Sequence, residues 1–377
     1  MGSGKWEVGS KLNYICRLIV TIHQQYIERC IELARRGAGS VAPNPMVGAV
    51  LVHNNRIIGE GWHQQYGQAH AEVNCIASVK EEDKKLIAAS VMYVSLEPCA
   101  HFGKTPPCTD LIIRNKIPKV VIGCRDPFKE VDGRGIEKLK AAGIEVVPGV
   151  MEQECKELNK RFFTFHTKQR PHIILKWAQT ADGFMASPNP SAGGGSAPQR
   201  QRLLISNAYS NRLVHQWRSE EAAILVGTNT ALADDPELTN RLWPGKSPVR
   251  LVSDMNLRLP ASLKLFDGSI KTIVFNAVKQ EEKENLLFYR LEKNKKFIPQ
   301  LLKALYKLNI LSVLVEGGAT LLQSFIDEGT WDEARLIVNN ELSISNGLTA
   351  PVLPGAVKVE EMNLLSDKIS IFKYPGY

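Results

Sequence analysis

Hydrophobic and polar residues follow two different periods along residues 23–150, and this pattern predicts the first half of the fold. Apolar side chains recur at helical spacing from Tyr26 to Ala34, and Gly37 then ends the predicted helix. Two apolar strands flank Asn54-Asn55, which is typical of a hairpin. Further along, the pattern favours helices over 70–80, from about 107 and over 135–143, and strands over 91–99, from 119 and over 144–150. We therefore expect a mixed sheet covered by helices, an α/β sandwich.

The pattern changes after residue 167 and predicts a second α/β unit. A buried strand begins at His172 and runs into an Asp182-Gly183 turn, and strands then alternate with helices as far as residue 344. Residues 158–171 are basic and aromatic and end in proline, so we interpret them as the bridge between the units. Residues 187–199 are rich in Pro, Gly and Ser, which favours a flexible loop. The predicted organisation is an extension over 1–22, one domain over 23–167 and another over 168–377.

Composition fits a chain of two ordinary globular domains. Its 377 residues are 44% hydrophobic, and 47 basic against 39 acidic residues leave a net charge of +8. The basic residues are spread along the chain and form no stripe with aromatic residues, so we expect no nucleic-acid partner. The seven cysteines show no disulfide-like spacing, which favours a reducing, cytoplasmic compartment with metal or catalytic roles for a few of them.

Residues 1–22 join a polar start to the apolar run LNYICRLIVTI. That run has 11 residues and contains Arg17, so it is too short to span a bilayer. It also lacks the small-residue cleavage site of a signal peptide. We therefore interpret residues 1–22 as an extension outside the fold and expect no membrane partner.

The clearest chemical feature is His70-Ala71-Glu72, followed by Pro98-Cys99 and then Cys108. One imidazole and two thiolates supply three zinc ligands, and a catalytic zinc site keeps its fourth position for water. Zinc lowers the pKa of that water, and a carboxylate two residues after the histidine can move its proton to the substrate and the leaving ammonia. The pattern H-x-E…P-C is typical of zinc-dependent nucleobase deaminases, which predicts Glu72 as the catalytic proton carrier.

The second cysteine departs from the usual spacing of that pattern. Eight residues separate Cys99 from Cys108, where the general signature has two. Pro106-Pro107 stiffens the return of the chain, and Cys108 can open the next helix, whose N-terminus favours a thiolate. A structural zinc knot or buried cysteines would account for some of these residues, but their combination favours a deaminase.

One motif in the second half suggests a phosphate site. The segment LVEGGATLLQSF predicts a strand, two glycines and a helix, so that the backbone can approach a ligand and the helix N-terminus can offer free N–H groups. A Gly-Gly pair before a helix also occurs in ordinary turns. The segment is not a GxGxxG fingerprint, so an ordinary Rossmann domain is not supported.

The segments APNPMVGAV, GEGWH, HAEVNC and SLEPCAHFGKTPPC together resemble the bifunctional riboflavin biosynthesis proteins. Those proteins join a diaminohydroxyphosphoribosylaminopyrimidine deaminase to a 5-amino-6-(5-phosphoribosylamino)uracil reductase. The resemblance begins at residue 23, extends over both domains and includes the long insertion between the cysteines. It implies a cytidine-deaminase-like α/β sandwich followed by a dihydrofolate-reductase-like α/β domain. It also implies one zinc ion per chain, NADPH, and a homo-oligomer that is a dimer or a tetramer.

The implied chemistry has two steps. The first is hydrolytic deamination of 2,5-diamino-6-(5-phosphoribosylamino)pyrimidin-4(3H)-one, and the second is NADPH-dependent reduction of the ribosyl chain to ribityl phosphate. In the deaminase half the resemblance implies that Asn44, in the PNP turn, binds the pyrimidine edge. It implies base or phosphate contacts for His63, His101 and Lys104, although each could instead be a surface polar residue. In the reductase half it implies substrate contacts for Arg218, Leu238, Arg241 and Glu316, and cofactor contacts for Ala178, Thr230, Asp234, Gly317, Gly318, Ala319 and Thr320.

One segment departs from this family. The family has a short Ser-Gly-Glu-Ser-Lys/Gln-Trp-Ile-Thr segment after the Asp-Gly turn. Here the stretch SPNPSAGGGSAPQRQRLLISN replaces it, and only Ile205-Ser206 clearly matches the end of that segment. An alternative function is a zinc nucleoside or tRNA deaminase with a non-reductase partner domain, but the Gly-Gly helix and TNTALADDPELT argue against it. A catalytically inactive deaminase-like domain is a third possibility, and the complete set of ligands with Glu72 argues against that one.

Overall fold

The computed structural model describes residues 21–102, 106–128, 131–187 and 203–375. The chain divides into two compact units, with the division between Lys168 and Gln169. All but the last two residues of the predicted extension lie outside the described ranges, and so does most of the predicted loop over 187–199. Within the described ranges, no helix is long and apolar enough to cross a membrane.

The first unit is built on a five-stranded mixed sheet with the order β2-β1-β3-β4-β5. Strand β1 pairs antiparallel with β2 and β3, whereas β3, β4 and β5 are parallel. The hairpin prediction is confirmed, because the left-handed φ angles of Asn54 (47°) and Asn55 (62°) close a tight turn. The strands are β1 (Gly48–His53), β2 (Arg56–Trp62), β3 (Val91–Leu96), β4 (Lys119–Cys124) and β5 (Glu145–Pro148).

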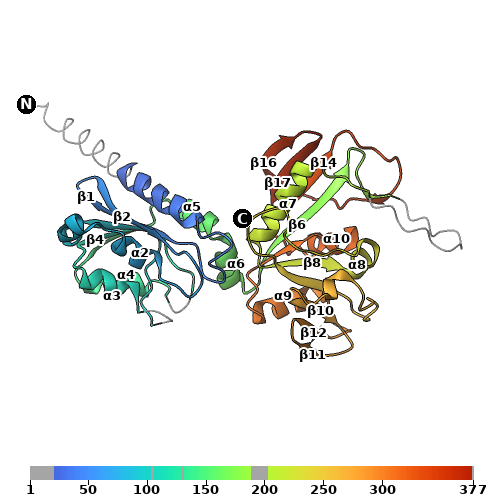
Figure 1. Ribbon diagram of the computed structural model, residues 1–377, viewed down its shortest axis with the longest axis horizontal. Coiled ribbons are helices and arrows are strands. Elements are labelled where there is room, and N and C mark those ends of the chain that lie inside the picture. Colours follow the sequence, from blue (N-terminus) through green and yellow to red (C-terminus); the bar gives the residue numbers. More distant parts are fainter. Residues whose placement is uncertain (1–20, 103–105, 129–130, 188–202, 376–377) are drawn as a thin grey trace, which may run out of the picture. The chain divides into compact units, whose positions relative to one another are not determined.

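Helices cover both faces of this sheet, as the sequence predicted (Figure 1). One buried cluster joins the sheet to α2 (Ala71–Ala77), α3 (Cys108–Arg114) and α4 (Arg134–Ala141), through side chains that include Ile112 and Leu139. The other joins it to a helix over residues 21–35 and to α5 (Glu152–Leu158), through side chains that include Ile31 and Cys155. A 3-10 helix, η1 (Glu81–Ala89), precedes β3. The segments that carry His70, Cys99 and Cys108 are therefore connected to a sheet that is packed against helices on both faces.

The segment interpreted as the bridge contains the division between the two units, and most of it is helical. Residues Lys160–Lys168 form α6, and the aromatic side chains of Phe162 and Phe165 are buried. These two phenylalanines are three residues apart, so they share one face of the helix and can pack together. The basic and aromatic composition of this segment reflects an amphipathic helix, which the sequence analysis did not predict.

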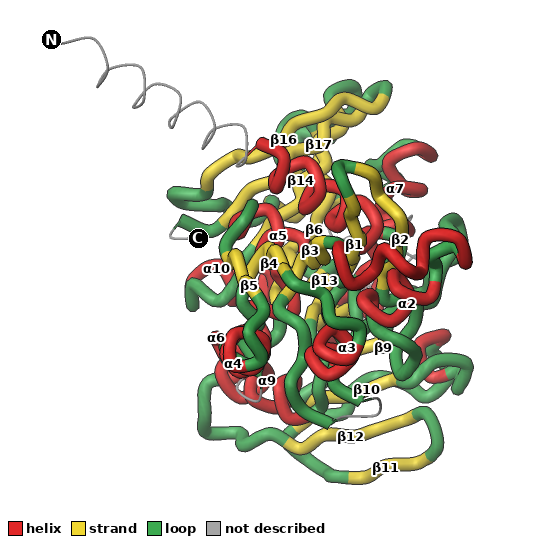
Figure 2. The backbone as a smooth tube through the Cα atoms, turned by 90° about the vertical axis from the view of Figure 1, so that its left-hand side faces the viewer, coloured by secondary structure: helices red, strands yellow, loops and turns green. Residues whose placement is uncertain are grey.

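The second unit contains a ten-stranded sheet with the order β11-β12-β10-β9-β8-β13-β6-β14-β17-β16. The strands from β12 to β14 in this order are parallel, and antiparallel strands lie at both ends. Figure 2 shows β11 beside β12 at one end of this sheet. The bounds are β6 (His172–Thr180), β8 (Ala223–Gly227), β9 (Val249–Ser253), β10 (Thr272–Asn276), β11 (Glu281–Lys283), β12 (Leu286–Arg290), β13 (Ser312–Val315), β14 (Glu333–Asn339), β16 (Val357–Leu364) and β17 (Asp367–Lys373).

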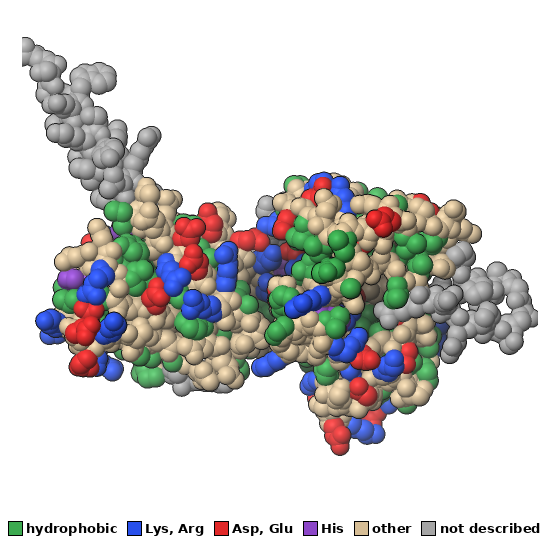
Figure 3. Space-filling model, turned by 45° about the horizontal axis from the view of Figure 1, so that its top comes forward, with side chains coloured by type: hydrophobic (Ala, Val, Ile, Leu, Met, Phe, Trp, Pro, Cys, Tyr) green, Lys and Arg blue, Asp and Glu red, His purple; other side chains and the backbone are tan. Residues whose placement is uncertain are grey.

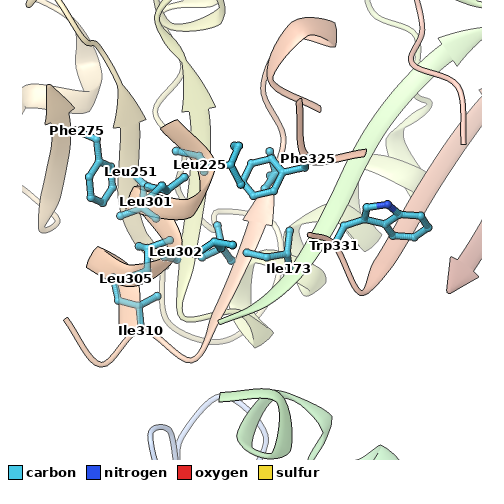
Figure 4. Close-up of a cluster of buried hydrophobic side chains, with 14 of the residues drawn as sticks. Ile173, Leu225, Leu251, Phe275, Leu301, Leu302, Leu305, Ile310, Phe325 and Trp331 are labelled. Carbon is cyan, nitrogen blue, oxygen red and sulfur yellow. The ribbon is translucent and has the colours of Figure 1, made fainter. Parts of the chain in front are cut away.

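In the described part of this unit there are four α-helices and a short 3-10 helix, η3 (Lys264–Phe266), and a short strand pair, β7 (Phe184–Ala186) with β15 (Leu348–Thr349), lies outside the large sheet. Asn207 caps the first of the helices by accepting hydrogen bonds from the backbone N–H groups of Tyr209 and Ser210. A buried cluster packs the sheet against leucines of the third, including Leu301 and Leu305 (Figure 4). The helices are α7 (Ala208–Glu220), α8 (Thr228–Asp234), α9 (Phe297–Lys307) and α10 (Ala319–Asp327).

Charged side chains of both signs are interspersed on the face of each unit that Figure 3 shows. The net charge of +8 is therefore not gathered into a single basic patch on that face. This distribution agrees with a surface that is kept soluble by mixed charge, and it gives no support to an extended polyanion site there.

Candidate metal centre and reductase site

The three predicted metal ligands lie together in the first unit. His70 directly precedes α2, Cys99 follows β3, and Cys108 is the first residue of α3. The Nδ1 atom of His70 is 3.6 Å from Sγ of Cys99 and 3.4 Å from Sγ of Cys108. All three donor atoms lie within 4.8 Å of one another, which is a spacing that one metal ion can bridge.

The two thiols shift each other's pKa values in opposite directions. Their mutual hydrogen bond lowers the pKa of Cys99 and raises the pKa of Cys108. The backbone N–H of Cys108 also donates to Sγ of Cys99 over 3.3 Å, which stabilises negative charge on that sulfur. One imidazole nitrogen and two thiolates form the soft donor set that zinc prefers, and the thiolates balance its charge, so these residues fit a zinc ion.

Glu72 lies beside this donor set in the first turn of α2. Its side chain is buried, with 3% of the residue exposed, and burial raises the pKa of the carboxyl group above its ordinary value. His70 and Cys99 act on it electrostatically, and the thiol of Cys108 is within hydrogen-bonding reach. A carboxyl group whose pKa is raised is better suited to accept and return a proton than an ordinary carboxylate.

The predicted base-binding residues in the first unit have distinct surroundings. Nε2 of His63 contacts the side-chain amide of Asn44 at 3.2 Å, and its Nδ1 contacts the carbonyl of Ala69 at 3.0 Å. The ring of His63 is 5.5 Å from that of His70, so Asn44 is close to the metal ligands. Nδ1 of His101 is buried and has no hydrogen-bond partner among the described residues. Lys104 lies outside the described residues.

Asn159 is a supporting residue that the sequence analysis missed. Its Oδ1 accepts from the backbone N–H of Met46, and its Nδ2 donates to the Met46 carbonyl, both at 2.8 Å. This pair of bonds anchors the turn that carries Asn44. The two residues are 113 positions apart, so no local pattern in the sequence connects them.

Glu97 ties the segment that carries Cys99 to the backbone of residues 126–136. It directly precedes Pro98-Cys99 and is 4% exposed. Its two carboxylate oxygens accept hydrogen bonds from the backbone N–H groups of Asp126, Gly133, Gly135 and Ile136, over 2.9 to 3.3 Å. The sequence could have indicated a supporting role for Glu97, because it is an acidic residue at the end of an otherwise apolar strand and a buried carboxylate needs hydrogen-bond partners.

The predicted glycine turn of the second unit lies between β13 and α10. A Cβ atom on Gly317 would lie 2.5 Å from Cα of Val226, so only glycine allows this close approach to β8. Gly318 has a left-handed φ of 51°, and a Cβ there would be 3.0 Å from Oγ1 of Thr230. Two segments predicted to contact the cofactor are therefore neighbours at the carboxyl edge of the parallel strands, where α/β folds bind ligands.

Other predicted cofactor positions belong to the same elements. Ala319 and Thr320 begin α10, Asp234 ends α8, and Ala178 lies near the carboxyl end of β6. Because β6, β13 and β8 are adjacent parallel strands, their carboxyl ends point to one edge of the sheet. Ala178 and the start of α10 therefore lie at this edge of the sheet, and Asp234 lies at the far end of α8, which leaves the same edge.

Arg218 and Glu316, both predicted to contact substrate, form an ion pair with each other. The guanidinium donates two hydrogen bonds to the carboxylate, over 2.9 and 2.7 Å, and the side chains are 14% and 8% exposed. Burial by itself would raise the pKa of Glu316, but the charges of Arg218 and Lys176 outweigh it and lower the pKa to about 2. Both side chains therefore remain charged and are held in place by each other at the edge of the sheet.

Arg241 is more accessible than Arg218. Its Nη1 donates to Glu237 and to the hydroxyl of Thr239, and half of its side chain is exposed. Leu238, which precedes this stretch, is buried with a left-handed φ of 53°. The four residues predicted to contact substrate in this unit thus include one exposed cation, a buried ion pair and one buried apolar side chain.

Comparisons with known proteins match both units. Residues 20–124 match the family described as the cytidine and deoxycytidylate deaminase zinc-binding region, and residues 171–342 match the RibD C-terminal domain. The riboflavin biosynthesis protein RibD of Aquifex aeolicus is 39% identical over 373 residues, covering 94% of this chain and 99% of the relative. The chain belongs to the RibD family.

Other RibD proteins support the same membership. RibD of Escherichia coli is 32% identical over 358 residues, covering 90% of this chain and 93% of that protein. A solved structure from Thermotoga maritima, described as a diaminohydroxyphosphoribosylaminopyrimidine deaminase/5-amino-6-(5-phosphoribosylamino)uracil reductase, is 36% identical with a TM-score of 0.80. It covers 94% of this chain, and the match includes 99% of that structure.

RibD membership confirms the fold class and the two activities expected from the sequence. The chain is an enzyme of riboflavin biosynthesis with a zinc-dependent deaminase part and an NADPH-dependent reductase part. The alternative of a nucleoside or tRNA deaminase with a non-reductase partner domain is not favoured, because the second half matches the RibD C-terminal domain.

Proposed function

We propose that the first unit hydrolyses the 2-amino group of 2,5-diamino-6-(5-phosphoribosylamino)pyrimidin-4(3H)-one. The second unit then reduces the ribosyl chain of 5-amino-6-(5-phosphoribosylamino)uracil to ribityl phosphate with NADPH. The observation that carries the proposal is the convergence of His70, Cys99 and Cys108 beside the buried carboxyl group of Glu72. The substrate names come from the similar deaminase/reductase of Thermotoga maritima.

In this proposal His70, Cys99 and Cys108 hold the zinc ion and Glu72 carries the proton. A zinc ion held there supplies Lewis-acid activation of a hydrolytic water. The carboxylate of Glu72 accepts a proton from the attacking water, passes one to the ring nitrogen and then assists the departure of ammonia. The raised pKa of Glu72 favours this role, since the group can hold the proton between the two transfers.

We propose that Asn44, His63, His101 and Lys104 surround the pyrimidine ribotide. The orientation of Asn44 is supported by the hydrogen bond with His63 and by the anchoring of its turn through Asn159. The buried and unpartnered Nδ1 of His101 is available to a ligand among the described residues. His63 is 2% exposed, so its contribution is made mainly through Asn44.

In the reductase unit, the glycine turn and α10 are proposed to hold the NADPH pyrophosphate. Gly317, Gly318, Ala319 and Thr320 bring backbone N–H groups to this place, and the remaining cofactor contacts come from Ala178, Thr230 and Asp234. Arg241 is proposed to bind the ribose phosphate because its guanidinium is half exposed. The Arg218–Glu316 pair and Leu238 shape the substrate site beside it.

We further propose a deaminase domain over residues 23–167 and a reductase domain over 168–377. The division of the chain between Lys168 and Gln169 supports this boundary to within one residue. The enzyme is proposed to act in the cytoplasm as a dimer or tetramer on small phosphoribosylated pyrimidines, with no nucleic-acid or membrane partner.

A paired assay tests the proposed function. Purified protein is given the diaminopyrimidine ribotide, and ammonia release is measured together with bound zinc. It is then given the deaminated ribotide and NADPH, and oxidation of NADPH is followed at 340 nm, the ordinary absorption band of the reduced nicotinamide. The proposal expects stoichiometric zinc and both activities. Protein that lacks stoichiometric zinc contradicts the deaminase assignment, and persistent absence of NADPH oxidation contradicts the reductase assignment.

A further inference from the structure

Two side chains of α7 hold one short backbone segment of the reductase unit. The backbone N–H of Arg241 donates to Nδ1 of His215 over 2.9 Å, and Nη1 of Arg218 donates to the carbonyl of Thr239 over 3.0 Å. His215 and Arg218 are three residues apart on α7, so they lie on the same face of the helix. The segment 239–241 is thus attached to the helix at both of its ends.

The hydrogen bond at His215 fixes the state of its ring. A backbone N–H can only donate, so Nδ1 of His215 carries no proton and the ring is neutral, with its hydrogen on Nε2. The residue is 2% exposed. Burial and the neighbouring cations Arg218 and Arg241 lower the pKa of His215 to about 4, against the opposite influence of Glu316 and Asn240. The ring therefore remains an acceptor throughout the neutral range.

The rest of the segment aims the side chain of Arg241. Its guanidinium donates to Glu237 over 2.7 Å and to Oγ1 of Thr239 over 2.6 Å. The amide of Asn240 donates to the carbonyls of Trp243 and Gly245, which closes the turn that follows. The backbone of Arg241 is therefore held by His215, and its side chain is held by its own loop, with half of its surface left free for a ligand.

We infer that His215 is a positioning residue for phosphate recognition, which acts by holding the backbone of Arg241. The inference rests on the proposed function of Arg241 as the ligand of the ribose phosphate. Without the acceptor on His215, the backbone N–H of Arg241 loses its hydrogen-bond partner. The backbone of Arg241 can then move, and the position of its guanidinium group is less well defined. A guanidinium group that is less ordered in the free enzyme binds the phosphate more weakly, because part of the binding free energy is then spent on ordering the side chain.

The test replaces the acceptor and compares two substrates. His215→Phe keeps a ring of similar size and removes the acceptor, and His215→Leu is a second variant should the first fail to fold. His215→Asn returns an acceptor, Oδ1, close to the place of Nδ1. Val214→Ala is the matched control, because Val214 is the adjacent residue of α7 and equally buried but packs in an apolar cluster and offers no hydrogen-bond acceptor in its side chain. Binding of NADPH by each variant checks that the reductase unit, which contains α7, remains folded, and ammonia release checks the deaminase unit.

The measurement is the KM of NADPH oxidation with the phosphorylated substrate and with its dephosphorylated counterpart. We expect His215→Phe to raise the KM for the phosphorylated substrate about tenfold, the equivalent of one lost hydrogen bond. The KM for the dephosphorylated substrate and both kcat values should change less than about twofold, as expected for a contact that concerns only the phosphate. His215→Asn should restore most of the lost affinity, and Val214→Ala should leave the ratio of the two KM values unchanged.

A double-mutant cycle with Arg241→Met separates this inference from the function on which it rests. In the Arg241→Met background, His215→Phe should add no further rise in KM, because the group through which it acts is gone. An equal rise for both substrates, or an additive effect in the cycle, overturns the inference and leaves the role of Arg241 standing. A normal KM for the phosphorylated substrate in Arg241→Met overturns the proposed role of Arg241 and the inference with it.

Discussion

At the scale of single residues, two buried acids show how opposite surroundings prepare a carboxyl group for opposite tasks. Glu72 is buried beside a histidine and two cysteines, and burial raises its pKa. Glu316 is equally enclosed, but the guanidinium of Arg218 faces it and its pKa falls to about 2. The raised pKa makes the first carboxyl group a better proton acceptor than an ordinary carboxylate, whereas the second remains an anion at neutral pH and serves as a fixed charge.

Glu72→Gln tests the proton carrier. The amide has nearly the same shape but cannot take up a proton, so deamination should fall by roughly three orders of magnitude, as expected for loss of general acid–base catalysis. Bound zinc, measured by atomic emission, should remain at the wild-type amount, because Glu72 is not one of the three ligands. NADPH oxidation by the same preparation is the internal control. Deamination near the wild-type rate would rule out Glu72 as the proton carrier.

The low pKa of Glu316 predicts an acid-dependent loss of stability in the reductase unit. The folded pKa, about 2, lies below the ordinary 4.5, so the stabilisation is complete above pH 4.5 and is lost as the pH falls towards 2. Between pH 6 and pH 3 the unfolding free energy should fall by about 2 kcal/mol from this group alone. Urea unfolding at several pH values measures it.

Glu316→Gln should lose that part of the pH dependence, and it should be less stable at pH 6, since Arg218 is left without its anion. Glu360→Gln, at an exposed position of β16, is the control and should keep the wild-type slope. If the wild type and Glu316→Gln lose stability in parallel between pH 6 and pH 3, the lowered pKa of Glu316 is refuted.

The residues that the sequence identified are those whose chemistry is visible in a short motif. His70, Glu72, Cys99 and Cys108 fall in two such motifs, and the structure brings the three ligands together. Asn159 could not be found in this way, because its partner Met46 is 113 positions away. The same holds for His215, whose ring accepts a hydrogen bond from a residue 26 positions along the chain. Supporting contacts of this kind depend on the tertiary fold.

At the scale of elements, the glycine turn between β13 and α10 makes the sharpest demand on the backbone. Gly317→Ala places a Cβ atom 2.5 Å from Cα of Val226, so the turn or β8 has to move. We expect a cost of about 1–3 kcal/mol in NADPH binding, or roughly ten- to hundredfold in its dissociation constant. Quenching of protein fluorescence on titration with NADPH measures this constant.

Gly227→Ala is the matched control for that substitution. Gly227 ends β8, next to Val226, and an added Cβ would meet its nearest neighbours at 3.9 Å, an ordinary contact. This variant should bind NADPH within about threefold of the wild type, because the added methyl group displaces no neighbouring atom. Deamination should be unchanged in both variants. Tight NADPH binding by Gly317→Ala would show that the cofactor does not depend on this turn.

The elements predicted from periodicity were those with a buried face or a distinctive turn. The hairpin at Asn54-Asn55 and the strands of the parallel sheets were found because their apolar runs are short and bounded. The division between the units falls inside the segment interpreted as a bridge, but its helix, Lys160–Lys168, was missed because basic residues separate the buried phenylalanines of α6. Strand β16 was missed because nearly all of it is exposed at the sheet edge, so its sequence, VKVEEMNL, has no buried run.

At the scale of the whole molecule, each unit has its own sheet and its own buried clusters. Those of the first unit pack against the five-stranded sheet, and those of the second pack against the ten-stranded sheet. Similarity to the Aquifex aeolicus RibD covers 94% of the chain, so both activities belong to one polypeptide. Separate cores imply that a disturbance confined to one unit leaves the fold of the other largely intact.

Removal of zinc tests this independence. The proposed ligands all belong to the first unit and come from three separate segments, before α2, after β3 and at the start of α3. A bound ion links these segments in the folded state, so its loss should remove up to about 4 kcal/mol of stability at saturating zinc. Treatment with a chelator should abolish ammonia release and lower the melting temperature of the first unit in calorimetry.

The second unit should keep its melting temperature and its NADPH oxidation with the deaminated ribotide, because none of its proposed site residues binds zinc. Addition of zinc should restore ammonia release, whereas magnesium should not, since it disfavours thiolate ligands. Loss of NADPH oxidation in parallel with ammonia release would mean that the reductase depends on the metal centre. Two separate melting transitions, of which zinc shifts only the first, are the result expected from two cores that fold around different sheets.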